Sequence, residues 1–169
     1  MVSLQPLEDR HLPGMEDIVA DPDALRFTRI PEPTPPGFAK TWLGRYQGTD
    51  ERVGFAIEDD DGTFLGLALA PEIDREGREV ELGYIVHPAA RGRGVATAAL
   101  KLLTRWAFDE LGALRAYLHI DVANAASRRV AERAGYVHEG TLRSAHVKQG
   151  LRADTELWSR LPSDPEPAD

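Results

Sequence analysis

The chain has 169 residues, a formal net charge of −8 and no cysteine. This length predicts one domain that needs no disulfide, and the missing thiols exclude disulfides, thiolate metal sites and a cysteine nucleophile. The negative charge argues against nucleic acid as a partner, because phosphate binding draws on a basic surface. We expect no signal peptide and no membrane span, since no stretch approaches about 20 apolar residues. A chain without thiols fits the reducing cytoplasm, which is the expected location.

Apolar periodicity predicts two helices and then three strands in the first half of the chain. They cover residues 13–24, 36–46, 53–58, 63–70 and 78–87. A proline-rich loop at 31–37 separates the two helices. In the second helix, aromatic side chains share one face and are expected to line or cover an acceptor site, or simply to pack in the core.

The second half predicts a long helix, a strand, a shorter helix and two closing strands. They cover residues 94–111, 114–121, 125–134, 136–145 and 153–160. This order favours an α+β fold with a mixed sheet and helices on both of its faces. Residues 1–161 are expected to form the single domain. The tail at 162–169, rich in proline and acid, is expected to be disordered.

The most informative segment runs from Glu81 to Ala96 and contains a strand, a loop rich in glycine and arginine, and the start of a helix. Unpaired N–H groups at a helix start and closely approaching glycines make an anion site suited to pyrophosphate. Pro88 can end strand pairing, so the strand before it can keep unpaired amides for an extended ligand such as pantetheine. A Walker motif and a dinucleotide fingerprint are both missing.

The run Arg91-x-x-Gly94-x-Ala96 resembles the signature of the GCN5-related N-acetyltransferases, the GNAT family. The segments that follow resemble the RimJ/RimL-like branch, whose members acetylate the N-termini of ribosomal proteins. They are Asn124 to Ser127, Glu132 to Tyr136, Glu139 to Arg143, and Gly150 with Asp154. The resemblance covers about residues 79–161. It implies the GNAT fold, a mostly antiparallel sheet of six to seven strands whose central parallel strands splay apart.

The resemblance implies that acetyl-CoA is the cosubstrate and that an amine is acetylated by direct attack on the thioester. The acceptor would be a small-molecule amine or a protein N-terminus, and a homodimer is expected from family habit. The implied CoA-binding residues lie at the end of the strand, in the loop and helix start of the anion site, and at the asparagine and serine farther along the chain. They are Ile85, Val86, His87, Arg91, Gly92, Arg93, Gly94, Val95, Ala96, Thr97, Asn124 and Ser127. Arg128, Arg129 or Arg133 could reach the CoA 3′-phosphate, although each can equally be a solvated residue.

An ammonium group must lose a proton before it can attack, so a general base is useful. The resemblance makes Glu81 the candidate base, with Glu79 as the alternate on the same strand face. The tyrosine that many family members use as the acid is replaced by Ala131. Ser127 is therefore the candidate proton donor to the CoA sulfur, with Tyr84 and Tyr136 as weaker candidates.

The same residues bear on a metal site, a serine hydrolase and a non-catalytic binding module. The histidines lack metal-like spacing, so no metal is predicted, and no Gly-x-Ser-x-Gly elbow supports a serine hydrolase. The missing tyrosine leaves open a non-catalytic, acyl-CoA-binding or regulatory module on the same fold.

Overall fold

The computed structural model describes residues 1–168 and contains one seven-stranded sheet in the order β1-β2-β3-β4-β5-β7-β6. Neighbouring strands are antiparallel except β4 and β5, which run parallel. The strands are β1 (Ser3–Pro6), β2 (Val53–Glu58), β3 (Phe64–Asp74), β4 (Glu79–Val86), β5 (Arg115–Asp121), β6 (Val137–Lys148) and β7 (Leu151–Arg160). The predicted α+β fold with a mixed, mostly antiparallel sheet is confirmed.

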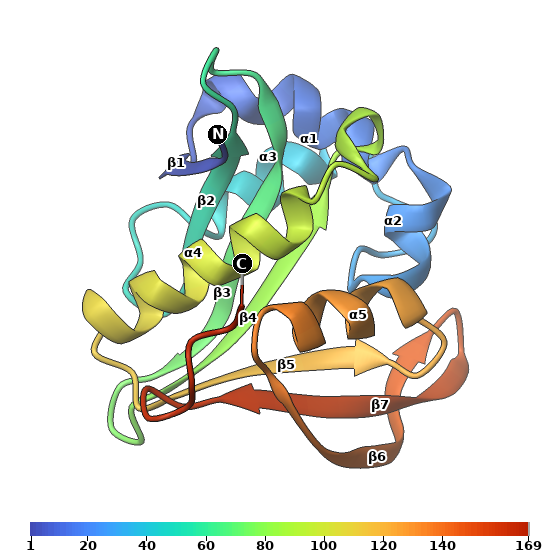
Figure 1. The fold of residues 1–169 in the computed structure, drawn as a ribbon. Helices are drawn as coiled ribbons and strands as arrows, with labels where there is room; N and C mark the ends of the chain where they lie inside the picture. Colours follow the sequence, from blue (N-terminus) through green and yellow to red (C-terminus); the bar gives the residue numbers. More distant parts are fainter. Residues whose placement is uncertain (169) are drawn as a thin grey trace.

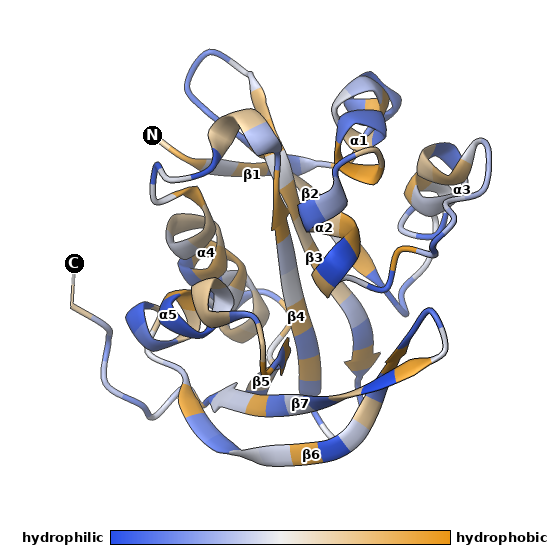
Figure 2. Ribbon diagram, turned by 90° about the vertical axis from the view of Figure 1, so that its right-hand side faces the viewer, coloured by the Kyte–Doolittle hydropathy of each residue, from blue (hydrophilic) through white to orange (hydrophobic). Residues whose placement is uncertain are grey.

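Helices cover both faces of the sheet, as Figures 1 and 2 show. The helices are α1 (Leu12–Val19), α2 (Pro22–Phe27), α3 (Phe38–Gly44), α4 (Val95–Asp109) and α5 (Ala125–Arg133), with two short 3-10 turns, η1 (Asp9–His11) and η2 (Pro88–Ala90). One buried cluster lies under α4 and α5, and a second lies between α1–α3 and the other face. No helix within residues 1–168 is long and apolar enough to cross a membrane.

Two local signals correct the expected N-terminal half. The helix expected at 13–24 is two helices, because the Asp21 carboxylate accepts the Ala24 N–H at 2.8 Å and caps a new helix that starts at Pro22. The helix expected from residue 36 begins only at Phe38, after Gly37 in the left-handed conformation. Strand β1 was not predicted; its four residues pair with β2 at the edge of the sheet.

Helix α4 presents a continuous buried stripe to the sheet. Each of its buried members lies three or four residues from another. They are Val95, Ala99, Leu100, Leu103, Thr104 and Ala107. Leu102 lies at the margin of this stripe and is half-buried. Truncating Leu103 to alanine would cost about 2–5 kcal/mol, because it leaves a cavity beneath the helix.

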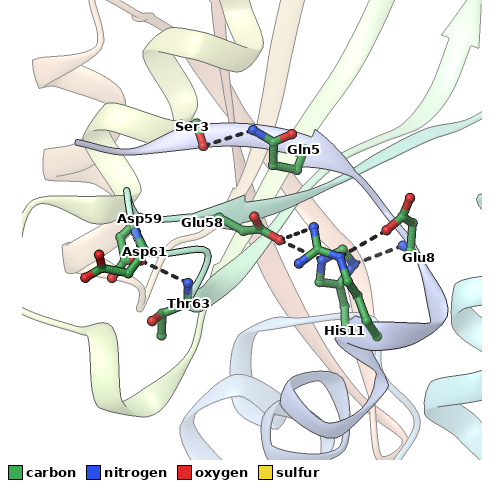
Figure 3. Close-up of polar contacts among 9 residues, drawn as sticks. Ser3, Gln5, Glu8, His11, Glu58, Asp59, Asp61 and Thr63 are labelled. Atoms are coloured by element: carbon green, nitrogen blue, oxygen red, sulfur yellow. Dashed lines mark hydrogen bonds and ion pairs between the residues drawn. The ribbon is translucent and has the colours of Figure 1, made fainter.

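A polar cluster fastens the start of α1 to the end of β2 (Figure 3). The buried His11 ring accepts the Glu8 N–H at Nδ1, 2.9 Å away, and its Nε2 lies 2.8 Å from Glu58. Because Nδ1 is an acceptor here, Nε2 carries the proton and donates to the carboxylate. Arg10 also pairs with Glu58 at 2.7 Å, so this buried carboxylate is satisfied. The cluster holds α1 in the position from which it reaches the loop after β4.

The two central parallel strands separate soon after they meet. Strands β4 and β5 pair only through residues 79–81 and 115–117. Beyond this point β4 continues to pair with β3, and β5 continues to pair with β7. The splayed central strands that the sequence resemblance implied are therefore present, and one edge of β4 is left open beyond Glu81.

After β7 ends, the C-terminal segment returns to contact α4. Glu166 pairs with Arg160 at 3.3 Å, and Lys101 of α4 donates a hydrogen bond to the Ala168 carbonyl at 2.9 Å. Both Glu166 and Ala168 belong to the segment 162–169 that was predicted to be disordered. Residue 169 lies outside the described residues.

Candidate functional site

The loop after β4 has the backbone shape of an anion site. The His87 N–H donates to Leu65 at 2.8 Å, and η2 then turns the chain toward α4. Gly92 and Gly94 both have φ of +75°, and a Cβ atom at either glycine would meet open space within 4 Å. The chain therefore presents bare backbone to this space at the residue that precedes α4.

The amides at the end of this loop and in the first turn of α4 have no acceptor among residues 1–168. Within the described residues, no backbone carbonyl accepts the N–H groups of residues 92–97, and the first intrahelical bond joins Ala98 to Gly94 at 3.1 Å. Helix α4 is 15 residues long, and its N-terminus adds a partial positive charge. Free donors and a positive helix end suit a pyrophosphate group.

Arg91, the first of the two arginines in the loop, is already paired. Arg91 forms an ion pair with Asp21 and a longer one, 3.6 Å, with Asp23. The hydrogen bond from Arg91 lowers the pKa of Asp21 against the opposing effect of burial. His87 reaches Asp17 of α1 at 3.1 Å. Helices α1 and α2 are thus fastened to the loop, and the Arg91 N–H donates to the Pro88 carbonyl at 3.4 Å.

Two hydroxyl groups meet across the splay. Asn124 caps α5 by accepting the Ser127 N–H at 3.1 Å, which leaves its amide NH₂ free for another acceptor. The Ser127 hydroxyl lies 2.8 Å from the Tyr84 hydroxyl, which comes from β4. Burial raises the pKa of Tyr84 to about 12 although the bond to Ser127 opposes it, so the phenol stays protonated. The sequence singled out these two residues separately, and the structure brings them together.

Glu81 lies on the opposite face of β4, where it is 5% exposed. Arg29 reaches its two carboxylate oxygens at 2.7 and 3.3 Å, and His119 Nδ1 lies 3.2 Å from the nearer one. Burial alone raises the pKa of Glu81, but the hydrogen bond from His119 and the charge and hydrogen bonds of Arg29 outweigh it and lower the pKa overall. Glu81 is therefore an ionised carboxylate at neutral pH, and a weak base.

Further carboxylates surround this position. Glu72 of β3 stands opposite Glu81 in the register, and Glu79 precedes it on the same face. Burial, followed by the charges of these three glutamates, raises the pKa of Tyr117 on β5 to about 12. The alternate base, Glu79, is 41% exposed in its side chain and pairs with Arg115 at 3.3 Å. A field of this sign attracts a cationic ligand.

The loop that carries Arg29 is held from the C-terminal hairpin. Lys148, at the end of β6, donates to the Thr28 carbonyl at 3.0 Å and pairs with Glu32 at 3.2 Å. It also donates to the carbonyl of Ile30. Segments more than a hundred residues apart in the chain thus enclose one side of Glu81.

The remaining candidates from the sequence lie on α5 and just before β6. Arg128 pairs with Glu156 at 3.5 Å, while Arg129 and Arg133 are exposed. The hydroxyl of Tyr136 lies 2.7 Å from that of Thr104 in the core, so this tyrosine does not face the splay. No cluster of three or more histidine or acidic side chains within residues 1–168 is placed to hold a metal ion.

Sequence reasoning missed Arg29 and the role of His119. The alternation of β5 placed His119 on one face with Tyr117, and that pattern could have paired it with Glu81 on the neighbouring strand. No local pattern marks Arg29, because its contact with Glu81 spans 52 positions.

Comparison with known proteins gives one family. The family model described as "Acetyltransferase (GNAT) domain" matches residues 2–137. The protein named "Putative ribosomal N-acetyltransferase YdaF" of Bacillus subtilis is 34% identical over 101 residues, which are 60% of this chain and 55% of that protein. Spermidine N(1)-acetyltransferase of Vibrio cholerae is 31% identical over 109 residues, which are 64% of this chain and 63% of the relative. The matches therefore span less than two-thirds of these relatives' own length.

Solved structures agree on the fold. The crystal structure of spermidine N-acetyltransferase from Vibrio cholerae in complex with CoA and spermine superposes with a TM-score of 0.87 over 96% of both chains. The sequence identity across this superposition is 22%, so the likeness establishes the arrangement of the chain alone.

Proposed function

Because this chain belongs to the GNAT acetyltransferase family, we propose that it transfers an acetyl group from acetyl-CoA to a primary amine. The observation that carries the proposal is the open edge of β4 beyond Glu81, which leads directly into a loop of unpaired amides. An extended cosubstrate with a pyrophosphate at one end and amides along its arm matches both features.

Coenzyme A would bind mainly through backbone groups. The N–H groups of Gly92 to Thr97 would hold the pyrophosphate, and the strand from Ile85 to His87 would pair with the pantetheine arm. Asn124 would donate its free amide to that arm. Arg91 would act by adding positive charge beside the loop, because its side chain pairs with Asp21 and its N–H donates to Pro88.

The acceptor would enter on the face that carries the glutamates. A lysine-like amine, with a pKa of about 10.4, is almost fully protonated at neutral pH, whereas an α-amine at about 7.7–8.0 is partly free. The charges of Glu72, Glu79 and Glu81 favour a cationic amine. Both a small-molecule amine and a protein N-terminus meet this description, and the relatives above are named as a spermidine N(1)-acetyltransferase and a putative ribosomal N-acetyltransferase. Glu81 would take part in removing the proton.

The thiolate that departs would form near Ser127. When the amine nitrogen bonds to the carbonyl carbon, the C–S bond breaks and the sulfur gains charge that a hydroxyl donor can stabilise. Ser127 would donate to the sulfur, and Tyr84 would donate to Ser127 across their 2.8 Å contact. This pair would stand in for the tyrosine that Ala131 replaces.

A homodimer would form through the outer edge of β6. This 12-residue strand ends the sheet and is exposed along most of its length, with Val137, Leu142 and Val147 at 58%, 42% and 50% exposure. Exposed apolar side chains on a long edge strand favour pairing with another chain. Sedimentation would show a dimer that Leu142→Lys weakens; a monomer at micromolar concentration would contradict this part of the proposal. A cytoplasmic location remains a prediction.

Thiol release tests the proposed reaction. The protein would be incubated with acetyl-CoA and a panel of polyamines, aminoglycosides, amino-acid derivatives and N-terminal peptides, and free CoA would be measured with a thiol reagent. We expect release above the hydrolysis background with at least one cationic amine, and an acetylated product by mass spectrometry. Binding of CoA by calorimetry without turnover on any acceptor would instead support a non-catalytic acyl-CoA-binding module.

A further inference from the structure

The carboxylate at the centre of the acceptor face is poorly suited to accept a proton itself. Glu81 accepts hydrogen bonds from two nitrogens of Arg29 and one of His119, so its lone pairs are largely engaged. The adjacent guanidinium also stabilises its negative charge. A group held in this way orients its neighbours better than it takes protons from a substrate.

His119 has the geometry of the missing base. Since Glu81 is ionised and can only accept, His119 Nδ1 must carry the proton of their 3.2 Å contact. In the neutral ring this leaves Nε2 with a free lone pair. Within residues 1–168, no hydrogen-bond partner engages that nitrogen, and the side chain is 30% exposed, so an incoming ligand can reach it.

The position of His119 in the sheet puts it where the reaction would occur. The last paired residues of β4 and β5 are Glu81 and Tyr117, and His119 follows Tyr117 by two residues on the same strand face. It therefore lies just inside the opening of the splay, on the strand that parts from the open edge of β4. Its ring packs edge-on against Tyr117, with centroids 5.5 Å apart, which restricts its orientation.

We propose that His119 is the general base for the acceptor amine and that Glu81 is the positioning residue that holds its tautomer and orientation, an inference that rests on the proposed function. His119 Nε2 removes one proton from the ammonium and becomes imidazolium beside the Glu81 carboxylate. The free amine bonds to the thioester carbonyl carbon, and the C–S bond breaks. The second nitrogen proton neutralises the CoA thiolate, and the first passes from His119 to solvent. The arrangement follows the carboxylate–histidine logic of hydrolytic triads.

The test compares substitutions of His119 at saturating acetyl-CoA. His119→Ala should lower kcat for the acceptor amine by about 10²–10⁴-fold at neutral pH, with CoA affinity unchanged. His119→Asn, whose amide NH₂ can take the place of Nδ1 as donor to Glu81 but which cannot take a proton, should lose as much. Added imidazole should restore part of the activity of His119→Ala. It should leave the activity of wild type unchanged. Glu81→Gln should lose less, about tenfold, because it only misaligns the ring.

His138→Ala is the matched control, since this histidine packs on Trp158 of β7 and touches none of the site residues; its kinetics should equal those of wild type. Activity of either His119 variant within twofold of wild type would overturn the inference, as would a loss that imidazole does not rescue or that accompanies weaker CoA binding. Wild-type turnover is measured first with the same amine. If wild type releases no thiol, the proposed function itself fails; if only the His119 results fail, the proposed reaction stands with another base.

Discussion

The cosubstrate side and the acceptor side of this molecule are built in different ways. The cosubstrate side is a backbone site: free amides, two left-handed glycines and an open strand edge, all within residues 82–97. The acceptor side is a side-chain site, where Arg29, Glu81 and His119 converge from distant segments. A backbone site is encoded locally and tolerates most side-chain changes, whereas a side-chain site depends on each partner and on the loops that deliver it.

The sharpest way to break this contrast is to place a charge within the backbone site. Gly94→Glu should weaken CoA binding by at least 100-fold, because it strains a residue at φ of +75° and places a carboxylate among the amide donors. Calorimetry with CoA measures the effect. Gly48→Glu is the control, since Gly48 also has positive φ and open space around it but lies in the loop before β2. Equal CoA affinity in wild type and Gly94→Glu would refute the assignment.

The hydroxyl pair at the splay tests whether side chains matter on the cosubstrate side. Ser127→Ala should lower kcat about tenfold by removing a donor to the departing thiolate, and Tyr84→Phe should lower it by a few-fold, each with little change in KM. Steady-state thiol release measures both. Tyr136→Phe loses a buried hydroxyl contact and about 1 kcal/mol of stability, yet should keep kcat. A loss of kcat in Tyr136→Phe as large as that in Tyr84→Phe would mean that the effect is structural.

Removing the cation from the acceptor side should improve binding of a cationic substrate. Arg29 holds the carboxylate that would otherwise attract the ammonium, so Arg29→Gln should lower KM for the amine about three- to tenfold, roughly 0.7–1.4 kcal/mol, and leave CoA affinity unchanged. Arg26→Gln is the control, because Arg26 stacks on Phe27 and makes no contact with Glu81. A raised KM in Arg29→Gln would show that Arg29 assists the acceptor.

The smallest effect concerns the ion pair between Arg91 and Asp21, which joins the loop after β4 to the start of α2. The pKa of Asp21 is lowered in the folded protein, so the Arg91 contact stabilises the fold above the unfolded value near 3.9 and is lost as pH falls through the lowered folded value. Asp21→Asn keeps the helix cap and should cost about 0.5–1 kcal/mol at pH 7. Thermal unfolding should show a Tm lower by about 1–4 °C at pH 7 and a smaller difference near pH 2. A difference that does not shrink in acid would mean that the ion pair contributes nothing.

Local sequence decided most of the elements and the cosubstrate half of the site. The helix from Gly94, the alternating strand at 115–121 and the cap at Asn124 all depend on neighbours within a few positions, and the structure contains each of them. The break at Asp21 and Pro22 was also encoded locally, as a cap followed by proline, but the apolar period across it favoured one helix.

The sequence by itself determined the fold class and the loop of free amides, because glycines, caps and apolar periods act over one or two helical turns. Only the tertiary structure decided which side chains surround Glu81, that Arg91 turns to Asp21, and that Tyr84 meets Ser127. These contacts join residues 38 to 70 positions apart. Their pairing depends on the strand order and on where β4 and β5 separate, which no local pattern specifies.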